Sequence, residues 1–306
     1  SIGSGSTTSR ALNRHPPATE ETRVVKLLAC IDLSQYAASV CDHAAWVATR
    51  LGGAVELLHV IQRKDAMAAR QDLSGALGLG AKSTLMEELV SIEEAEAKLA
   101  REQGRALLAA SEERLRSAGV QDITRVHRHG GIVETVIERE ADADLVVIGK
   151  RGASADFARG HLGSKVERVV RQSLKPVLAA NRAFRPINRA LIAFDGAQSA
   201  RKAVSFVATS SLFAGVEVHL VTVGAENNDK TRDSLRWAVE VLGERCKRAE
   251  IVPGEVDGAL KAQAEQAAAD MLVMGAYGHS PLRSMIVGST TTAMIRRLTL
   301  PVLLFR

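Results

Sequence analysis

The sequence of 306 residues is poor in aromatic side chains: six Phe, two Trp and two Tyr make up 3% of it. This scarcity argues against a protein that stacks nucleic-acid bases on aromatic rings, and it requires a core of Val, Leu, Ile and Ala. The excess of one sign of charge is also small, because 40 Lys and Arg are nearly balanced by 35 Asp and Glu. A net charge of +5 is too small to indicate a nucleic-acid partner, although it suits a small anionic ligand.

Cysteines and long apolar runs are few as well. The three cysteines, Cys30, Cys41 and Cys246, form no Cys-x-x-Cys pair, which predicts buried thiols in a reducing, cytoplasmic setting. No apolar run approaches the ~18 residues of a transmembrane helix, so we expect no membrane partner. Residues 1–23 start with a Gly/Ser/Thr-rich stretch that lacks the apolar core of a secretory signal, and we expect them to form a disordered lead.

The chain does contain an internal repeat. The segment ADLVVIGKRG (143–152) matches ADMLVMGAYG (269–278), and both are followed by a Gly-Ser-led stretch that ends in Pro-Val-Leu. Upstream, an apolar run ending at Asp32 matches a run ending at Asp195. The first pair of segments lies 126 residues apart and the second pair 163, so the first copy carries 37 surplus residues.

Each copy alternates short apolar runs with amphipathic helical stretches. Continuous apolar runs of five to eight residues between helices are typical of a parallel sheet that is covered on both faces. We therefore predict an α/β protein with two doubly wound, Rossmann-like domains in tandem. Domain 1 is expected at 24–182, a linker at 183–188 and domain 2 at 189–306.

The surplus of the first copy lies mainly between Gln62 and Ala100. It leads into a charged helix in which four leucines recur at roughly helical spacing: Leu99, Leu107, Leu108 and Leu115. We expect this helix to pack on domain 1 through those leucines. Its charged face is most simply solvated, and a lid or a partner surface is the alternative.

The second copy holds the strongest candidate site: Gly275-Ala-Tyr-Gly278, nine residues, and then Gly288-Ser289-Thr290. Gly275 ends an expected parallel strand, and ligands of open α/β sheets bind at the carboxyl ends of strands. Glycines let a backbone approach phosphate oxygens, and a helix that begins at Ser289 offers free N–H groups to an anion. The spacing predicts a phosphate-binding site, although a turn and a helix cap alone would use the same residues.

These motifs resemble those of the universal stress protein family, whose ATP-binding members carry G-x2-G-x9-G-[S/T] after the fourth strand. The second copy matches at Gly275, Gly278, Gly288 and Ser289, and the likeness extends over residues 24–306. The resemblance implies a tandem universal stress protein whose domains are like those of the adenine nucleotide α-hydrolases. It also implies ATP, with or without Mg²⁺, at the carboxyl edge of the second sheet, and a role as a stress-response sensor or switch.

The resemblance assigns two further positions in domain 2. The Asp after the first strand lies near the ribose in the family, which carries over to Asp195. The end of the second strand meets the adenine, which carries over to Thr222 when residues 216–223 are aligned with 54–61. The nine-residue spacer has no acid and offers two basic side chains. The predicted nucleotide site is therefore Asp195, Thr222, Gly275, Gly278, His279, Arg283, Gly288, Ser289 and Thr290.

The first copy departs from the family pattern. Its glycines Gly149 and Gly152 are followed by ten residues, one more than in the motif, before Gly163-Ser164. This spacer contains Asp156, whose carboxylate would repel phosphates if the loop kept its place. On Coulomb grounds, an anion should prefer the site in the second copy.

Three basic residues of the first copy would instead attract an anion to domain 1: Lys150, Arg151 and Arg159. We therefore place ATP in domain 2 and expect domain 1 to be degenerate or differently specific. The weaker site that we assign to domain 1 consists of Asp32, Gly149, Gly152, Gly163 and Ser164.

No catalytic or metal site is indicated. The sequence has no Gly-x-Ser-x-Gly elbow tied to a triad, no His-Glu-x-x-His motif, and no Ser/Gly-rich loop after the first strand as in ATP-pyrophosphatases. His127 and His129 would share a strand face, but no nearby Cys or acidic pattern completes a metal set, so we expect an exposed strand end. His59 lies within an apolar strand and is expected in the core. We predict at most weak ATP hydrolysis.

Two other functions stay open. One is a slow ATPase or an adenylyl-transferring enzyme of the same fold, and the other is an interaction protein that binds no nucleotide and uses the helical insertion. Single-domain family members pair through edge elements that include the last strand, and short apolar edge strands need a cover. We therefore expect Pro176–Ala180 to pair with Pro301–Phe305 in an internal pseudo-dimer, with a homodimer of whole chains also open.

Overall fold

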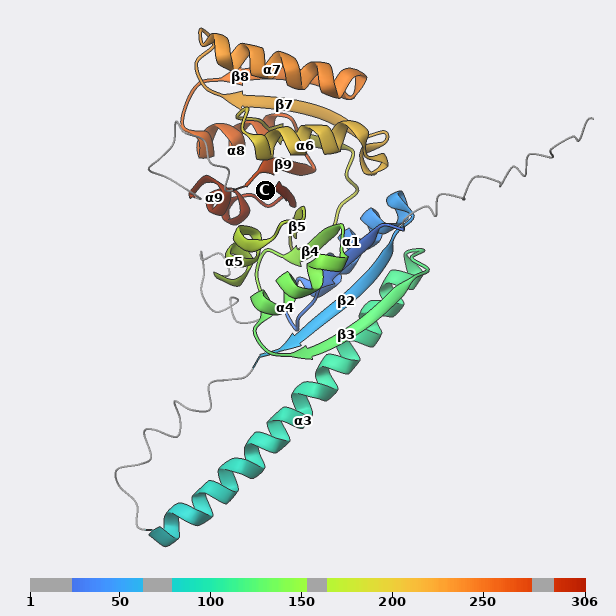
Figure 1. Ribbon diagram of the computed structural model, residues 1–306, viewed down its shortest axis with the longest axis vertical. Helices are drawn as coiled ribbons and strands as arrows, with labels where there is room; N and C mark the ends of the chain where they lie inside the picture. Colours follow the sequence, from blue (N-terminus) through green and yellow to red (C-terminus); the bar gives the residue numbers. More distant parts are fainter. Residues whose placement is uncertain (1–23, 63–78, 153–163, 277–288) are drawn as a thin grey trace, which may run out of the picture.

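The computed structural model describes residues 24–62, 79–152, 164–276 and 289–306. In this part of the chain, ten strands form one continuous sheet in the order β3-β2-β1-β4-β5-β10-β9-β6-β7-β8 (Figure 1). The elements of domain 1 are β1 (Lys26–Cys30), α1 (Ala37–Leu51), β2 (Ala54–Ile61), α3 (Leu79–Ser117), β3 (Ile123–His129), α4 (Ile132–Arg139), β4 (Leu145–Gly149), α5 (Ser164–Gln172) and β5 (Val177–Ala180). Those of domain 2 are β6 (Arg189–Ala193), α6 (Gln198–Thr209), β7 (Glu217–Val223), α7 (Asp229–Leu242), β8 (Cys246–Val252), α8 (Val256–Gln266), β9 (Met271–Gly275), α9 (Ser289–Arg297) and β10 (Val302–Phe305).

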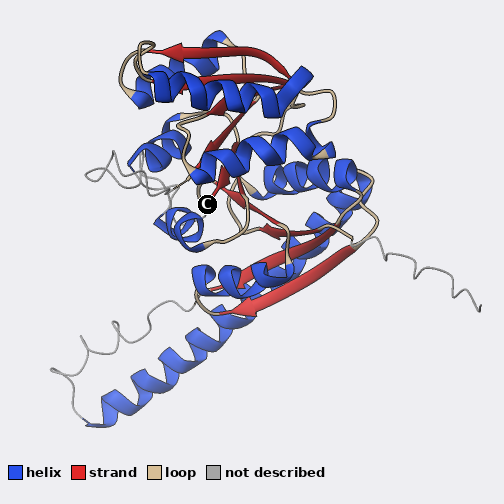
Figure 2. Cartoon of the chain, turned by 45° about the horizontal axis from the view of Figure 1, so that its top comes forward, coloured by secondary structure: helices blue, strands red, loops and turns tan. Residues whose placement is uncertain are grey.

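Each domain contributes five parallel strands, which confirms the predicted doubly wound α/β fold. All five residues of β4 are buried, as a continuous apolar run between two helix layers requires. Successive strand residues point to opposite faces, so that Leu27 belongs to one core and Leu28 to the other. Helices α1, α3, α6 and α7 cover the first core, and α4, α5, α8 and α9 cover the second. Figure 2 shows helices on both faces of the sheet.

The two domains meet through their last strands, as predicted. Strands β5 and β10 pair antiparallel, with Val302 opposite Ala179 and Leu304 opposite Val177. Leu178 pairs with Leu303, its own counterpart in the repeat, so a pseudo-twofold axis passes between these two residues. Because each strand covers the open edge of the other, neither half-sheet ends at this seam.

Helix α3 is 39 residues long, and among its described side chains those of the C-terminal part pack on domain 1. Leu108 and Leu115 are buried and Leu107 is partly buried, as expected, but Leu99 is 54% exposed, so its predicted packing is wrong. The reason is that the N-terminal half of α3 extends away from the sheet (Figure 1). Despite this length, no described helix is apolar enough over a sufficient span to cross a membrane.

Candidate functional site

Three predicted residues of domain 2 lie at one edge of the sheet. Gly275 ends β9, Asp195 follows the end of β6 by two residues, and Thr222 is the last but one residue of β7. Strand β6 lies between the other two, with Ala193 opposite both Met274 and Val221. Because all three strands run parallel, their carboxyl ends converge on this edge.

Asp195 fixes the turn between β6 and α6. Its Oδ1 accepts a hydrogen bond from the backbone N–H of Ala197 at 3.0 Å, and Gly196 takes a left-handed backbone conformation with φ of 78°. Asp32 does the same in domain 1, where its Oδ1 accepts from the N–H of Ser34 at 3.0 Å. An Asp is favoured here because its short carboxylate can bond the backbone two residues on.

Gly275 has a packing role that is independent of any ligand. A Cβ at this position would lie 2.5 Å from Oγ of Ser199 and 2.7 Å from the backbone N of Ala200, in the first turn of α6. Gly149 ends β4 in the same way, and a Cβ there would lie 2.8 Å from Cβ of Tyr36. Glycine at these strand ends therefore lets the first helix of each domain approach the sheet closely.

Thr222 is buried, and its Oγ1 has no hydrogen-bond partner among the described residues. The sheet register identifies its counterpart in domain 1. Lys26 and Arg189 are the first residues of β1 and β6, and they pair with Ala54 and Glu217, the first residues of β2 and β7. Position 222 of β7 therefore corresponds to position 59 of β2. That counterpart is His59, which is buried and forms a hydrogen bond between Nδ1 and the carbonyl of Ile31 at 3.0 Å. Both domains thus place a polar side chain at the same point of the second strand.

The expected phosphate side of the site is placed in part. Helix α9 begins at Ser289 and includes Thr290, as predicted, and α5 begins at Ser164, so the Ser of each Gly-Ser pair is the first residue of a helix. The remaining predicted residues lie outside the described part of the chain: Gly163, Gly278, His279, Arg283 and Gly288. Asp156 and Arg159 of the first spacer lie outside it too.

Comparison with known proteins decides the family. A model of the universal stress protein family matches residues 25–181 and again 186–306. The universal stress protein Slr1230 of Synechocystis is 36% identical over 284 residues, which cover 92% of this chain and 99% of the relative. The chain belongs to the universal stress protein family.

Solved structures of similar fold include a universal stress protein from Archaeoglobus fulgidus, with 23% identity and a TM-score of 0.66. That likeness covers 92% of this chain and 96% of the other. A functionally unknown protein from Pseudomonas aeruginosa has 16% identity and a TM-score of 0.62, with 92% of each chain covered. At these identities the structures support the tandem fold alone.

In domain 1 of this universal stress protein, the structure brings three residues of the weaker site together. A Cβ at Gly152 would lie 2.8 Å from Oδ2 of Asp32, so the loop after β4 passes directly over the Asp that follows β1. Gly149 stands at the base of the same loop. Among the described residues, no three His, Cys, Asp or Glu side chains gather in a way that could hold a metal ion.

Lys150 does not serve this site, contrary to the expectation that it would attract phosphate there. It is only 5% exposed, and its Nζ donates hydrogen bonds to the carbonyls of Leu298 and Leu300 in domain 2, just beyond the C-terminal end of α9. Burial, together with the charge of Arg151, lowers the pKa of Lys150 to about 7. No sequence pattern predicts this contact, because Lys150 stands between two motif glycines and its partners are about 150 residues away.

Proposed function

We propose that this universal stress protein binds ATP at the carboxyl edge of domain 2 and acts as a cytoplasmic stress-response sensor or switch. The observation that supports the proposal most is the convergence of Gly275, Asp195 and Thr222 at the ends of three adjacent strands. The intact motif spacing then leads to α9, which begins at Ser289.

Each residue has a role that suits its chemistry. The Asp195 carboxylate is exposed at the strand edge and can accept hydrogen bonds from the ribose hydroxyls. The free N–H groups at the start of α9 suit the phosphates, and the buried hydroxyl of Thr222, which lacks a partner among the described side chains, suits the adenine end. Mg²⁺, when present, would be held mainly by the phosphate oxygens. We assign no catalytic residue.

The test is a calorimetric titration of ATP into Gly278→Asp, with Gly152→Asp of domain 1 as the matched control. A carboxylate at position 278 would stand beside the phosphates, so we expect ATP affinity to fall at least about tenfold, while Gly152→Asp retains it. ATP affinity that is unchanged in Gly278→Asp would refute the proposal, as would an equal loss in Gly152→Asp. Phosphate release measured in the same samples separates a binding protein from a slow ATPase.

An interaction role is the second candidate, and the projecting half of α3 favours it. This segment leaves Val90, Ile92 and Leu99 exposed, and apolar side chains on a charged helix are a common basis of partner binding. Deletion of residues 65–100 should then remove partner binding and leave ATP affinity unchanged. A deletion that lowers ATP affinity instead would tie this segment to the nucleotide site.

A further inference from the structure

A cavity of about 520 Å³ lies between α3 and β3, far along the chain from the glycine motifs. Its lining residues are Arg101, Arg105, Leu108, Arg125, His127 and His129, and no carboxylate is among them. A chain with a net charge of only +5 thus gathers three guanidinium groups and two imidazoles around one small space.

The two periodicities of secondary structure bring these side chains together. Arg101, Arg105 and Leu108 recur every three or four residues and therefore share one face of α3. Alternate residues of β3 carry Arg125, His127 and His129 on one face of the sheet.

Close contact between α3 and the sheet depends on one glycine, Gly104. A Cβ at this position would lie 2.5 Å from Nε2 of His127 and 2.7 Å from Cδ2 of His59. His127 Nε2 is itself buried without a hydrogen-bond partner among the described residues. The base of the cavity is therefore built by tight packing rather than by a loose surface array.

The positive charge of this cavity is mostly uncompensated. Arg125 pairs with Glu112 at 3.0 Å, but Glu112 is shared with Arg116. Neither Arg101 nor Arg105 forms an ion pair with any described residue. Burial lowers the pKa of His127, and the charges of His59, His129 and Arg105 lower it further, as expected where positive groups crowd together.

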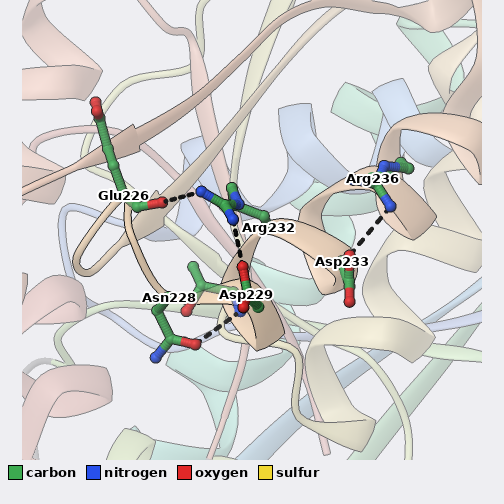
Figure 3. Close-up of polar contacts among 7 residues, drawn as sticks. Glu226, Asn228, Asp229, Arg232, Asp233 and Arg236 are labelled. Atoms are coloured by element: carbon green, nitrogen blue, oxygen red, sulfur yellow. Dashed lines mark hydrogen bonds and ion pairs between the residues drawn. The ribbon is translucent and has the colours of Figure 1, made fainter.

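The corresponding place in domain 2 serves as an internal reference. A cavity between α7 and β8 is lined by Arg232 and Leu235, which have the same three-residue spacing as Arg105 and Leu108. There, however, Arg232 pairs with Asp229, and Arg236 pairs with Asp233 at 3.0 Å (Figure 3). The arginines of domain 2 are thus neutralised within one helical turn.

The strand that lines each cavity differs as well. His127 pairs with His59, and Ile251 pairs with Thr222, which is the counterpart of His59 in domain 2. His127 of β3 therefore corresponds to Ile251 of β8, and Arg125 corresponds to Ala249. Domain 2 therefore has a charge-balanced cavity with apolar strand residues, whereas the cavity of domain 1 is cationic.

We propose that the cavity between α3 and β3 binds the phosphate groups of a small phosphorylated molecule. Guanidinium groups match phosphate oxygens in a forked, bidentate geometry, and two of them here have no competing carboxylate. A volume of about 520 Å³ accommodates a small metabolite, and Leu108 adds an apolar wall. The site is separate from the nucleotide site of domain 2.

The test uses inorganic pyrophosphate and the full chain, with the ring signals of His127 and His129 followed by NMR at constant ionic strength. We expect saturable shifts in the wild type and at least tenfold weaker binding in Arg101→Gln/Arg105→Gln, whose side chains are exposed and whose loss should not disturb folding. Arg232→Gln/Arg236→Gln removes the same charge from domain 2 and should bind as the wild type does.

Shifts that do not saturate would overturn the proposal, and so would equal binding by Arg101→Gln/Arg105→Gln. Shifts that chloride reproduces at equal ionic strength would overturn it too. Gly278→Asp should keep the histidine shifts, because pyrophosphate that binds the glycine motif lies in the other domain. Loss of those shifts in Gly278→Asp would assign the signal to the nucleotide site and contradict a separate site between α3 and β3.

Discussion

At the scale of single residues, the first glycine of each motif has two separate explanations. The sequence predicted Gly275 and Gly149 from the close approach of backbone to phosphate. The structure adds the close approach of a helix to the end of a strand, at Ser199 in domain 2 and Tyr36 in domain 1. A glycine motif alone therefore does not separate nucleotide binding from packing, and each must be tested by its own measurement.

Gly275→Ala should destabilise domain 2 by about 1–3 kcal/mol, because the new methyl group would meet backbone atoms that cannot rotate away. Gly258→Ala is the matched control. Nothing lies within 4 Å of a Cβ at that position of α8, and alanine should stabilise the helix by about 0.5–1 kcal/mol. Urea unfolding measures both changes. A neutral Gly275→Ala would show that the strand and helix can separate without cost.

The site could be predicted from sequence only where its residues lie in a motif. Asp195 and Gly275 stand at the ends of apolar runs, which chain position alone reveals. The equivalence of Thr222 with His59 needed the pairing of β1 with β2 and of β6 with β7. Register depends on contacts between strands that are distant in sequence, and an alignment of two apolar runs does not contain it.

At the scale of elements, the two halves of α3 have different surroundings. Its C-terminal part is held by Leu108 and Leu115 against the core, whereas its N-terminal half has no sheet beneath it. Apolar spacing predicted the packed part correctly. Apolar spacing could not predict where the packing of α3 stops, because Leu99 keeps the helical spacing of the buried leucines and yet lies beyond the edge of domain 1.

Leu115→Ala and Leu99→Ala compare these two parts with the same chemical change. Leu115 is fully buried, so its truncation should lower the free energy of unfolding by about 2–5 kcal/mol. Leu99 is 54% exposed, and its truncation should change stability by about 0.5 kcal/mol at most. Thermal unfolding monitored by circular dichroism gives both values. A large effect of Leu99→Ala would place that residue in a contact, for example with a second chain.

At the scale of the whole molecule, the seam between the domains holds more than paired strands. Lys150 reaches from domain 1 to two carbonyls of domain 2, and Arg50 donates to the carbonyls of Leu212 and Ala214 at 3.2 and 2.8 Å. The pairing of β5 with β10 could be predicted from the resemblance to single-domain family members, together with the short apolar edge strands. These side-chain contacts could not, because they depend on the relative placement of the domains.

Lys150 should make stability depend on pH in a defined direction. Burial lowers its pKa from an ordinary 10.5 to about 7, so between these values the unfolded chain binds the proton and the folded chain does not. Stability should therefore rise from pH 7 to pH 10, by an amount on the order of a few kcal/mol, and the full penalty should apply below pH 7. The stability difference between wild type and Lys150→Met isolates this effect. A difference that is independent of pH would contradict the lowered pKa.

The pseudo-twofold axis between Leu178 and Leu303 has a consequence for how the halves can differ. In a homodimer of single domains, every substitution appears twice, once on each side of the axis, so a change that helps one subunit is imposed on the other. Here each position is encoded once. Lys150 can cross the seam while its counterpart, Ala276, has no side chain long enough to do so, and β3 can carry His127 while β8 carries Ile251. Covalent fusion therefore lets the two halves differ in sequence at equivalent positions, and dilution cannot separate them.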